Sequence, residues 1–216
     1  MREYRKAIKA YNKALKINDK AIEINPQDSV AWDDKGYILY ILNKFDEAIK
    51  AFDKAIEINP QSADTWFGKG NDLRVGLNKP DEAIKAYEKA IEINPNYPYA
   101  LSNIGIALLD LGRYDEAIKA FDKAIEINQN NSDAWYGKGN ALYYLEQKEE
   151  AIKAFDRAIE IDQKNSLAWS NKGNALRDLG RKEEAIKAFD KAIEIDPHNS
   201  DAWYNKGLNL LITKAT

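Results

Sequence analysis

The chain repeats one sequence block six times, and this repetition limits the possible folds more than any other feature. The block reads Ala-Ile-Glu-Ile followed by Asn or Asp, and its first isoleucine recurs at Ile22, Ile56, Ile91, Ile125, Ile159 and Ile193. The successive spacings are 34, 35, 34, 34 and 34 residues. Copies of this length stack on their neighbours instead of sharing one globular core. We therefore predict an array of short structural repeats.

Each copy has the periodicity of two helices, and residues 29–62 show it most clearly. Apolar and small residues recur at steps of three and four over 31–42 and again over 48–56, which is helical spacing. A polar turn that includes Asn43 separates the two runs. Pro60 ends the second run, because the residue before a proline avoids helical backbone. The copy is therefore predicted to fold as an antiparallel helix hairpin.

Small residues occupy fixed positions in both helices. The first helices share a glycine column, at Gly36, Gly70, Gly105, Gly139, Gly173 and Gly207. The second helices share an alanine column, at Ala48, Ala83, Ala117, Ala151 and Ala185. Glycine inside a helix costs about 1 kcal/mol relative to alanine. Since this cost recurs in every copy, we expect two helix backbones to approach closely there.

The spacing of marker residues within one copy is similar to that of a known family. The signature residues are Trp32, Gly36, Leu39, Ala48, Phe52, Ala55 and Pro60, and they resemble the tetratricopeptide repeat, a 34-residue helix–turn–helix unit. The resemblance covers nearly the whole chain. It implies an all-α fold, a right-handed α–α superhelix or solenoid of stacked antiparallel helix hairpins. It also implies a concave groove lined mostly by first helices.

One column departs from the family pattern. Lysine stands where the family usually has leucine, at Lys35, Lys69, Lys138, Lys172 and Lys206. We expect the aliphatic stem of each lysine to cover apolar surface while its amine reaches water.

The repeats divide the chain unevenly. Full copies are predicted at 29–62, 63–97, 98–131, 132–165 and 166–199, and the copy at 63–97 carries a one-residue insertion. Residues 1–28 have only second-helix pattern and are predicted to form one long N-terminal helix of that type. Residues 200–216 are predicted to form a terminal helix of the first type, as a half repeat or a cap.

The chain starts and stops within a repeat unit, so we expect it to be a piece of a longer protein. Two explanations of its ends remain open. In the first, the long N-terminal helix is a polar-backed cap, which repeat arrays need, and the C-terminus is a fraying edge or the boundary of an excised piece. Alternatively, the last helix of one chain meets the first helix of another in a heterologous contact. The residues expected in that self-association are Leu208, Leu211, Ile212, Tyr4, Ile8 and Tyr11.

Composition excludes several classes of function. The chain has 32 basic and 35 acidic residues and a net charge of −3, so it lacks the basic excess of a protein that binds phosphate backbones. It has no cysteine, and therefore no disulfide or thiolate metal site. No apolar run approaches the roughly 18–20 residues of a membrane span. We predict a cytoplasmic protein that binds neither nucleic acid nor membranes.

Catalytic motifs are missing from the sequence. His198 is the only histidine, and it lies in a loop between repeats. Pairs of acidic residues recur once per repeat at the start of second helices, where the helix dipole explains them. No phosphate-binding loop, dinucleotide fingerprint or EF-hand loop occurs. We therefore predict a protein that is not an enzyme and that uses no metal and no cofactor.

One stripe of the first helices remains after the core positions are assigned, and we call it the first-helix stripe. Its candidate peptide-binding residues are Tyr37, Asn71, Arg74, Asn103, Tyr136, Asn140, Tyr143, Asn171, Asn174, Arg177 and Asn205. An asparagine amide both donates and accepts, so it can bind peptide backbone of any sequence. The pairs expected to be neighbours across repeats are Asn71 with Asn103, Asn140 with Asn171, and Asn174 with Asn205. Asparagine at these places is also common in the average family unit, and this structural explanation stays open.

The charges of the stripe indicate the kind of ligand. Some family members bind the C-terminal carboxylate of chaperones through Lys and Arg on three consecutive first helices. Here the corresponding places carry Asp33, Phe67, Ser102, Tyr136 and Ser170, or Asp64, Asp133 and Asp201. Chaperone-tail binding is therefore disfavoured, and the acids indicate a neutral or basic ligand.

These observations predict a noncatalytic protein–protein interaction scaffold that binds a peptide or protein segment in its concave groove. The alternative is a self-assembling structural module joined through its incomplete terminal repeats.

Overall fold

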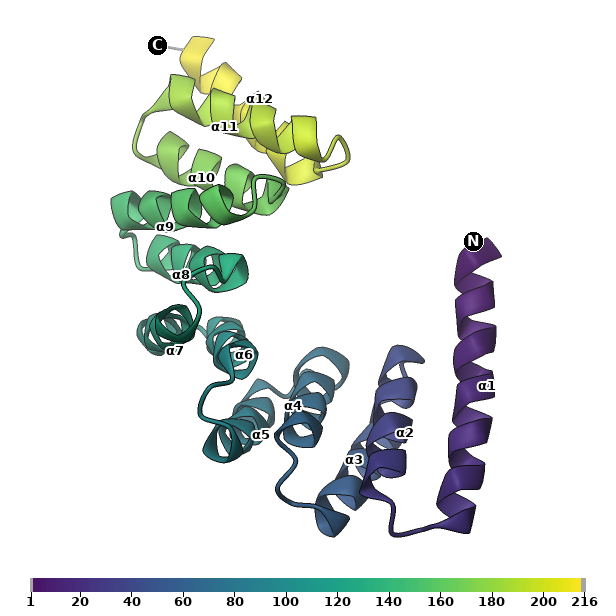
Figure 1. Ribbon diagram of the computed structural model, residues 1–216. Coiled ribbons are helices and arrows are strands. Elements are labelled where there is room, and N and C mark those ends of the chain that lie inside the picture. Colours follow the sequence, from purple (N-terminus) through teal and green to yellow (C-terminus); the bar gives the residue numbers. More distant parts are fainter. Residues whose placement is uncertain (1, 215–216) are drawn as a thin grey trace. The chain divides into compact units, whose positions relative to one another are not determined.

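The computed structural model describes residues 2–214, and helices make up all of its regular structure within that range. The helices are α1 (Arg2–Ile24), α2 (Ser29–Ile41), α3 (Phe45–Ile58), α4 (Ala63–Asn71), the π-helix η1 (Asp72–Gly76), α5 (Pro80–Ile93), α6 (Pro98–Asp110), α7 (Tyr114–Ile127), α8 (Ser132–Tyr144), α9 (Lys148–Ile161), α10 (Ser166–Asp178), α11 (Lys182–Ile195) and α12 (Ser200–Lys214). Figure 1 shows their order along the chain. This arrangement of helix hairpins confirms the predicted all-α solenoid class.

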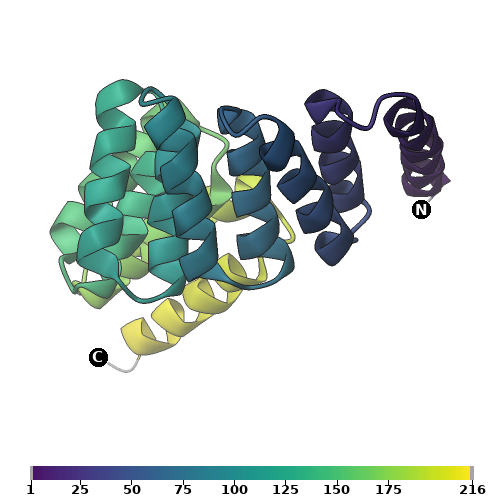
Figure 2. The ribbon, with the colours of Figure 1, turned by 90° about the horizontal axis from the view of Figure 1, so that it is seen from below.

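The chain forms two compact units, residues 1–111 and 112–216. In the first unit, α1 packs on α2, and then α2 and α3, α3 and α4, α4 and α5, and α5 and α6 pack in succession. In the second unit, the same succession runs from α7 to α12. Figure 2 shows consecutive helices of each unit lying side by side. Within each unit, each helix therefore contacts its neighbours in the sequence, as expected for a repeat array.

The glycine column serves a different purpose from the one predicted. A Cβ atom added to Gly36 would lie 2.6 Å from the ring of Phe52, and one added to Gly139 would lie 2.5 Å from the ring of Phe155. Four glycines of the column therefore make room for an aromatic ring of the second helix, not for a second backbone: Gly36, Gly70, Gly139 and Gly173. Phe52 and Phe155 are almost fully buried as a result.

The lysine column forms a recurring three-residue cluster that links one repeat to the next. Lys138 Nζ lies 2.6 Å from Asp122 Oδ1 on the preceding second helix and 5.4 Å from the ring centroid of Trp135. The same arrangement occurs at Lys35, Lys69, Lys172 and Lys206. The amine therefore binds a carboxylate and the face of an indole, whereas the sequence predicted only that it reaches water.

The third repeat replaces the tryptophan and the lysine of this cluster and keeps an acidic residue, Glu88, at the carboxylate position. Leu101 stands at the tryptophan position and Ile104 at the lysine position, and both are buried. The two substitutions occur together, which indicates that the lysine at this position depends on its tryptophan.

The one-residue insertion produces a local change of helix type. The first helix of the second repeat ends as α4 at Asn71 and continues as the π-helix η1. Leu77 N–H donates to the carbonyl of Asp72, five residues earlier, which is the π-helical bond. After the insertion Asn78 adopts a φ of 52°, like Asn43 at the same turn of the first repeat with a φ of 57°. The π-helix thus absorbs the additional residue and restores the repeat register.

Candidate binding surface

The first unit contains one of the predicted asparagine pairs. Asn103 Nδ2 donates to Asn71 Oδ1 at 2.8 Å, and this bond joins α6 to the end of α4. Tyr87 of α5 donates its hydroxyl to the same Asn71 oxygen at 2.9 Å. Tyr87 is fully buried, and burial raises the pKa of its hydroxyl to about 12. The Asn71 side chain is therefore held from two sides.

The second unit repeats the amide pair, and here the neighbouring tyrosine lies on a first helix and accepts a hydrogen bond. Asn171 Nδ2 on α10 donates to Asn140 Oδ1 on α8 at 2.8 Å and lies 3.2 Å from the hydroxyl of Tyr136. Burial raises the pKa of the Tyr136 hydroxyl, so this group stays protonated at neutral pH. We call each such amide pair a rung, because it bridges the first helices of successive repeats.

The third predicted pair differs from the expectation. Asn205 Oδ1 accepts a hydrogen bond from Arg177 Nη1 at 2.6 Å, not from Asn174. The buried Oδ1 atom of Asn174 has no hydrogen-bond partner in the described part of the chain. The long side chain of Arg177 takes the place that Asn174 was expected to have beside Asn205. Sequence spacing alone does not show which of these two side chains bonds to Asn205.

Both arginines of the stripe lie beside carboxylates. Arg177 Nη2 donates to Asp178 Oδ1 at 3.0 Å, and Tyr143 donates its hydroxyl to Asp178 Oδ2 at 2.6 Å. Burial, followed by the bond to Asp178, raises the pKa of Tyr143 to about 12. Arg74 Nη1 lies 3.6 Å from Asp110 Oδ2, and the buried Nε of Arg74 has no partner within residues 2–214. Neither arginine therefore presents an uncompensated positive charge.

An acidic edge with tyrosines lies at the start of the first-helix stripe. Tyr97 donates its hydroxyl to Asp64 Oδ1 at 2.9 Å. Burial raises the pKa of Asp33, and a hydrogen bond from Thr65 opposes this shift. The nearby side chain of Tyr37 is about half exposed, at 49%. Tyr97 and Tyr87 were missed from the sequence, because they lie in a loop and on a second helix instead of on the first-helix stripe.

The residues predicted for self-association lie on α1 and α12. Ile8 and Tyr11 are partly buried on α1, and Leu208 is partly buried on α12. Leu211 is 67% exposed. The side chains of Tyr4 and Ile212 fall outside the described part of the structure.

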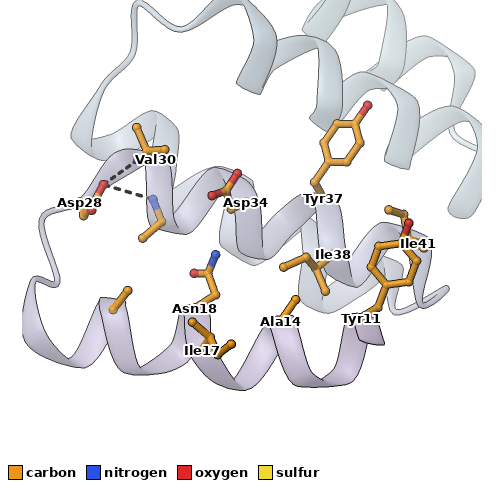
Figure 3. A pocket seen from close by; sticks show the side chains of 12 residues that line it. Tyr11, Ala14, Ile17, Asn18, Asp28, Val30, Asp34, Tyr37, Ile38 and Ile41 are labelled. Carbon is orange, nitrogen blue, oxygen red and sulfur yellow. Dashed lines mark hydrogen bonds between the residues drawn. The ribbon is translucent and has the colours of Figure 1, made fainter. Parts of the chain in front are cut away.

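A groove of about 600 Å³ lies between α1 and α2. Figure 3 shows Tyr11, Ile17 and Asn18 on α1 across from Asp34, Tyr37 and Ile41 on α2. We call it the α1–α2 groove. It joins Tyr11, predicted for self-association, to Tyr37, predicted for peptide binding. Its existence was missed because the sequence shows which residues share a helix face, but not which faces stay uncovered.

No helix within residues 2–214 is both long and apolar enough to cross a membrane. Over the same residues, no group of three or more His, Cys, Asp or Glu side chains is placed to hold a metal ion.

Comparison with family models decides the relationship that the sequence pattern indicated. Models described as tetratricopeptide repeat match residues 108–166, 136–200 and 170–215, and others match 75–135 and 17–50. A further TPR repeat model matches residues 36–71. The chain belongs to the tetratricopeptide repeat (TPR) family. No curated protein matches it.

Solved structures of TPR proteins share this fold. YrrB, described as a TPR protein with an unusual peptide-binding site, is 27% identical with a TM-score of 0.69, over 88% of this chain and 97% of that protein. MamA is 26% identical with a TM-score of 0.70, over 78% of this chain and 92% of MamA. The pilus biogenesis factor PilW is 20% identical with a TM-score of 0.81, over 94% and 93% of the two chains, and at this identity it shows the fold alone.

Proposed function

We propose that this TPR protein is a noncatalytic scaffold that binds a peptide or protein segment along its first-helix stripe. The observation that carries the proposal is the rung, which occurs in both units, as Asn71–Asn103 and as Asn140–Asn171. In each rung the first asparagine accepts the bond, so its own amide N–H groups keep donor capacity for the carbonyls of a ligand. The second bond on each rung, from Tyr87 or to Tyr136, fixes the amide in place before a ligand arrives.

The charge of the stripe supports a neutral or basic segment. Arg74 and Arg177 are each compensated by a neighbouring aspartate. Asp33 and Asp64 add negative charge at the start of the stripe. An acidic ligand would therefore meet repulsion without an available cation. The description of YrrB as a peptide-binding TPR protein agrees with a peptide ligand for this chain.

A peptide array followed by fluorescence titration tests this proposal. The double variant Asn140→Ala/Asn171→Ala should bind a selected peptide about 10-fold more weakly or worse, because each lost hydrogen bond contributes roughly 1 kcal/mol. Asn130→Ala is the matched control, since Asn130 is exposed in the loop before α8 and lies off the stripe. Equal affinities of the double variant and the control would rule out the rung as the binding element.

Self-association is the second candidate function. It is favoured by the apolar and aromatic exposure of α12, where Tyr204 is 68% exposed and Leu211 is 67% exposed. Contiguous exposed apolar surface marks interaction sites in soluble proteins. Light scattering over a concentration series should show a rise in mass, and a constant monomer mass at several hundred micromolar would exclude this function.

A further inference from the structure

The α1 wall of the α1–α2 groove is a surface that a first helix covers elsewhere in the chain. Ala14, Ile17, Asn18 and Ala21 precede Ala48, Ala51, Phe52 and Ala55 by one repeat of 34 residues. All four residues of that later set are buried in α3, which packs on its own first helix α2. In α1, by contrast, Ile17 is 61% exposed. The face that α3 buries is therefore open on α1.

The α2 wall is equivalent to a surface through which one first helix meets the preceding one. Asp34 and Ile41 correspond, at an offset of 137 residues, to Asn171 and Asp178 of α10. These two residues of α10 bond to Asn140 and Tyr143 of α8. The groove between α1 and α2 thus has both walls of a site for one helix of the first type.

The chain also contains a first-type helix whose complementary face is open. A Cβ added to Gly207 of α12 would meet nothing within 4 Å, whereas at Gly36 or Gly173 it would meet an aromatic ring of the second helix at 2.6 Å. Leu210 of α12 is 43% exposed, whereas Leu39 at the equivalent position of α2 is 1% exposed. Helix α12 therefore offers the face that a second helix covers elsewhere.

We propose that α12 of one copy docks in the α1–α2 groove of a second copy, so that α12 and α1 form a helix hairpin between two chains. This inference rests on the second candidate function and names the two surfaces that meet. The register follows from pairs within the chain. The Gly36–Phe52 pair places Gly207 opposite Asn18, and the Tyr143–Asp178 pair places Leu211 opposite Ile41.

The side chains on the two surfaces agree with this register. At the position of Leu211 and Ile41, two equivalent pairs within the chain make polar contacts, Arg74 with Asp110 and Tyr143 with Asp178. Leu211 and Ile41 are both apolar, so each can bury the other across the proposed contact. The pair Tyr136–Asn171 places the exposed Tyr204 opposite Asp34, where its hydroxyl can donate to the carboxylate.

The contact is heterologous, because groove and helix are different surfaces of one chain. Docking one copy leaves a free groove on one chain and a free α12 on the other, so association continues to larger assemblies. Blocking either surface should stop this growth. Two chains blocked at different surfaces should still pair, because each keeps the surface that the other has lost.

Two half-blocked variants test this head-to-tail arrangement. Ile17→Asp places a carboxylate in the groove and leaves α12 intact, whereas Leu211→Asp does the reverse. Both side chains are exposed in the single chain, so folding should be unaffected, and circular dichroism checks this. Each variant alone should be monomeric, because an unpaired charge in the contact weakens it by roughly 100-fold or more. An equimolar mixture should form a 1:1 dimer and nothing larger in size-exclusion chromatography with light scattering.

Leu167→Asp is the matched control, since Leu167 is 55% exposed on α10, away from both surfaces, and should assemble like the wild type. Asn18→Phe should strengthen association by roughly 10-fold, because it restores the ring that other second helices place against a glycine. The proposal is wrong if the wild type stays monomeric, if Ile17→Asp assembles normally, or if the mixture stays monomeric. The rung variant Asn140→Ala/Asn171→Ala should assemble normally, so failure of either proposal is recognised separately.

Discussion

The side-chain carboxyl group of Asp72 is buried inside a helix hairpin. Its exposed fraction is 0%, and neither carboxyl oxygen has a hydrogen-bond partner within residues 2–214. Burial, followed by the charge of Asp46, raises the pKa of Asp72 to about 7 from an ordinary value of 3.8. The folded state therefore binds this proton more tightly than the unfolded state. The contribution of Asp72 to the free energy of unfolding should fall as pH rises from about 4 to about 7, and stay constant above that.

Replacing Asp72 with alanine should remove this pH-dependent loss, which is about 4 kcal/mol at 1.36 kcal/mol per pKa unit. Alanine fits, since Ala107, Ala141 and Ala175 occupy the equivalent positions. Urea unfolding at pH 4.5 and pH 8 should show that the free energy of unfolding of Asp72→Ala, relative to that of the wild type, is higher at pH 8 than at pH 4.5. Asp46→Asn should give a smaller gain, because it removes only the second cause. A difference between Asp72→Ala and wild type that does not change with pH would contradict the raised pKa.

The Trp135–Lys138 pair offers a second prediction at the residue scale. The third repeat holds Leu101 and Ile104 at these positions. The double substitution Trp135→Leu/Lys138→Ile therefore gives the fourth repeat the residues of the third. Trp135→Leu alone leaves Lys138 with Asp122 but without the indole. The double variant should therefore lose less free energy of unfolding than the sum of the losses in the two single variants. The difference, which is the coupling energy of the pair, should be about 1 kcal/mol. Chemical unfolding of all four proteins measures it, and strict additivity would show that the residues act independently.

At the scale of elements, the π-helix η1 is the local cost of one added residue. Deleting Val75, which is 53% exposed, should restore the 34-residue spacing and a continuous first helix. The deletion variant should be at least as stable as the wild type. The residues up to Leu73 and from Leu77 onward should keep their packing partners, because only the extra residue between them is removed. Deleting Tyr144, 59% exposed at the equivalent place of a standard repeat, should cost several kcal/mol, since it shifts the hairpin out of register. Thermal unfolding compares them, and similar losses in both would contradict this explanation.

The sequence predicts the elements well because period 34 and helical spacing are local properties. Phe52 and Gly36 could be assigned to facing columns, but whether a ring or a backbone fills the space depends on the rotamer of Phe52. The rungs at Asn71–Asn103 and Asn140–Asn171 follow from spacing between repeats, whereas the bond from Arg177 to Asn205 depends on the reach of a long side chain. Side-chain length and rotamer choice lie beyond a pattern of residue types.

At the scale of the whole molecule, stability should be distributed along the chain, because within each unit each helix contacts its sequence neighbours. Helix α12 packs on α11 and α10, and Ala202 belongs to the buried cluster around Phe189. A chain that stops at Asn199 therefore loses the partner of α11. Its backbone amides in α10 and α11 should exchange hydrogen at least ~10-fold faster, whereas those in α3, α4 and α5 should keep their wild-type rates.

Hydrogen exchange followed by mass spectrometry measures these rates by segment. The full chain and the chain that stops at Asn199 should be compared at a concentration where the full chain is monomeric. Loss of α12 docking between copies then does not contribute to the faster exchange. His198→Ala, in the loop before α12, controls for a local change without removal of the helix. A uniform acceleration over all helices would show that the repeats unfold as one cooperative body, since neighbour-limited coupling confines the loss to the helices beside the cut.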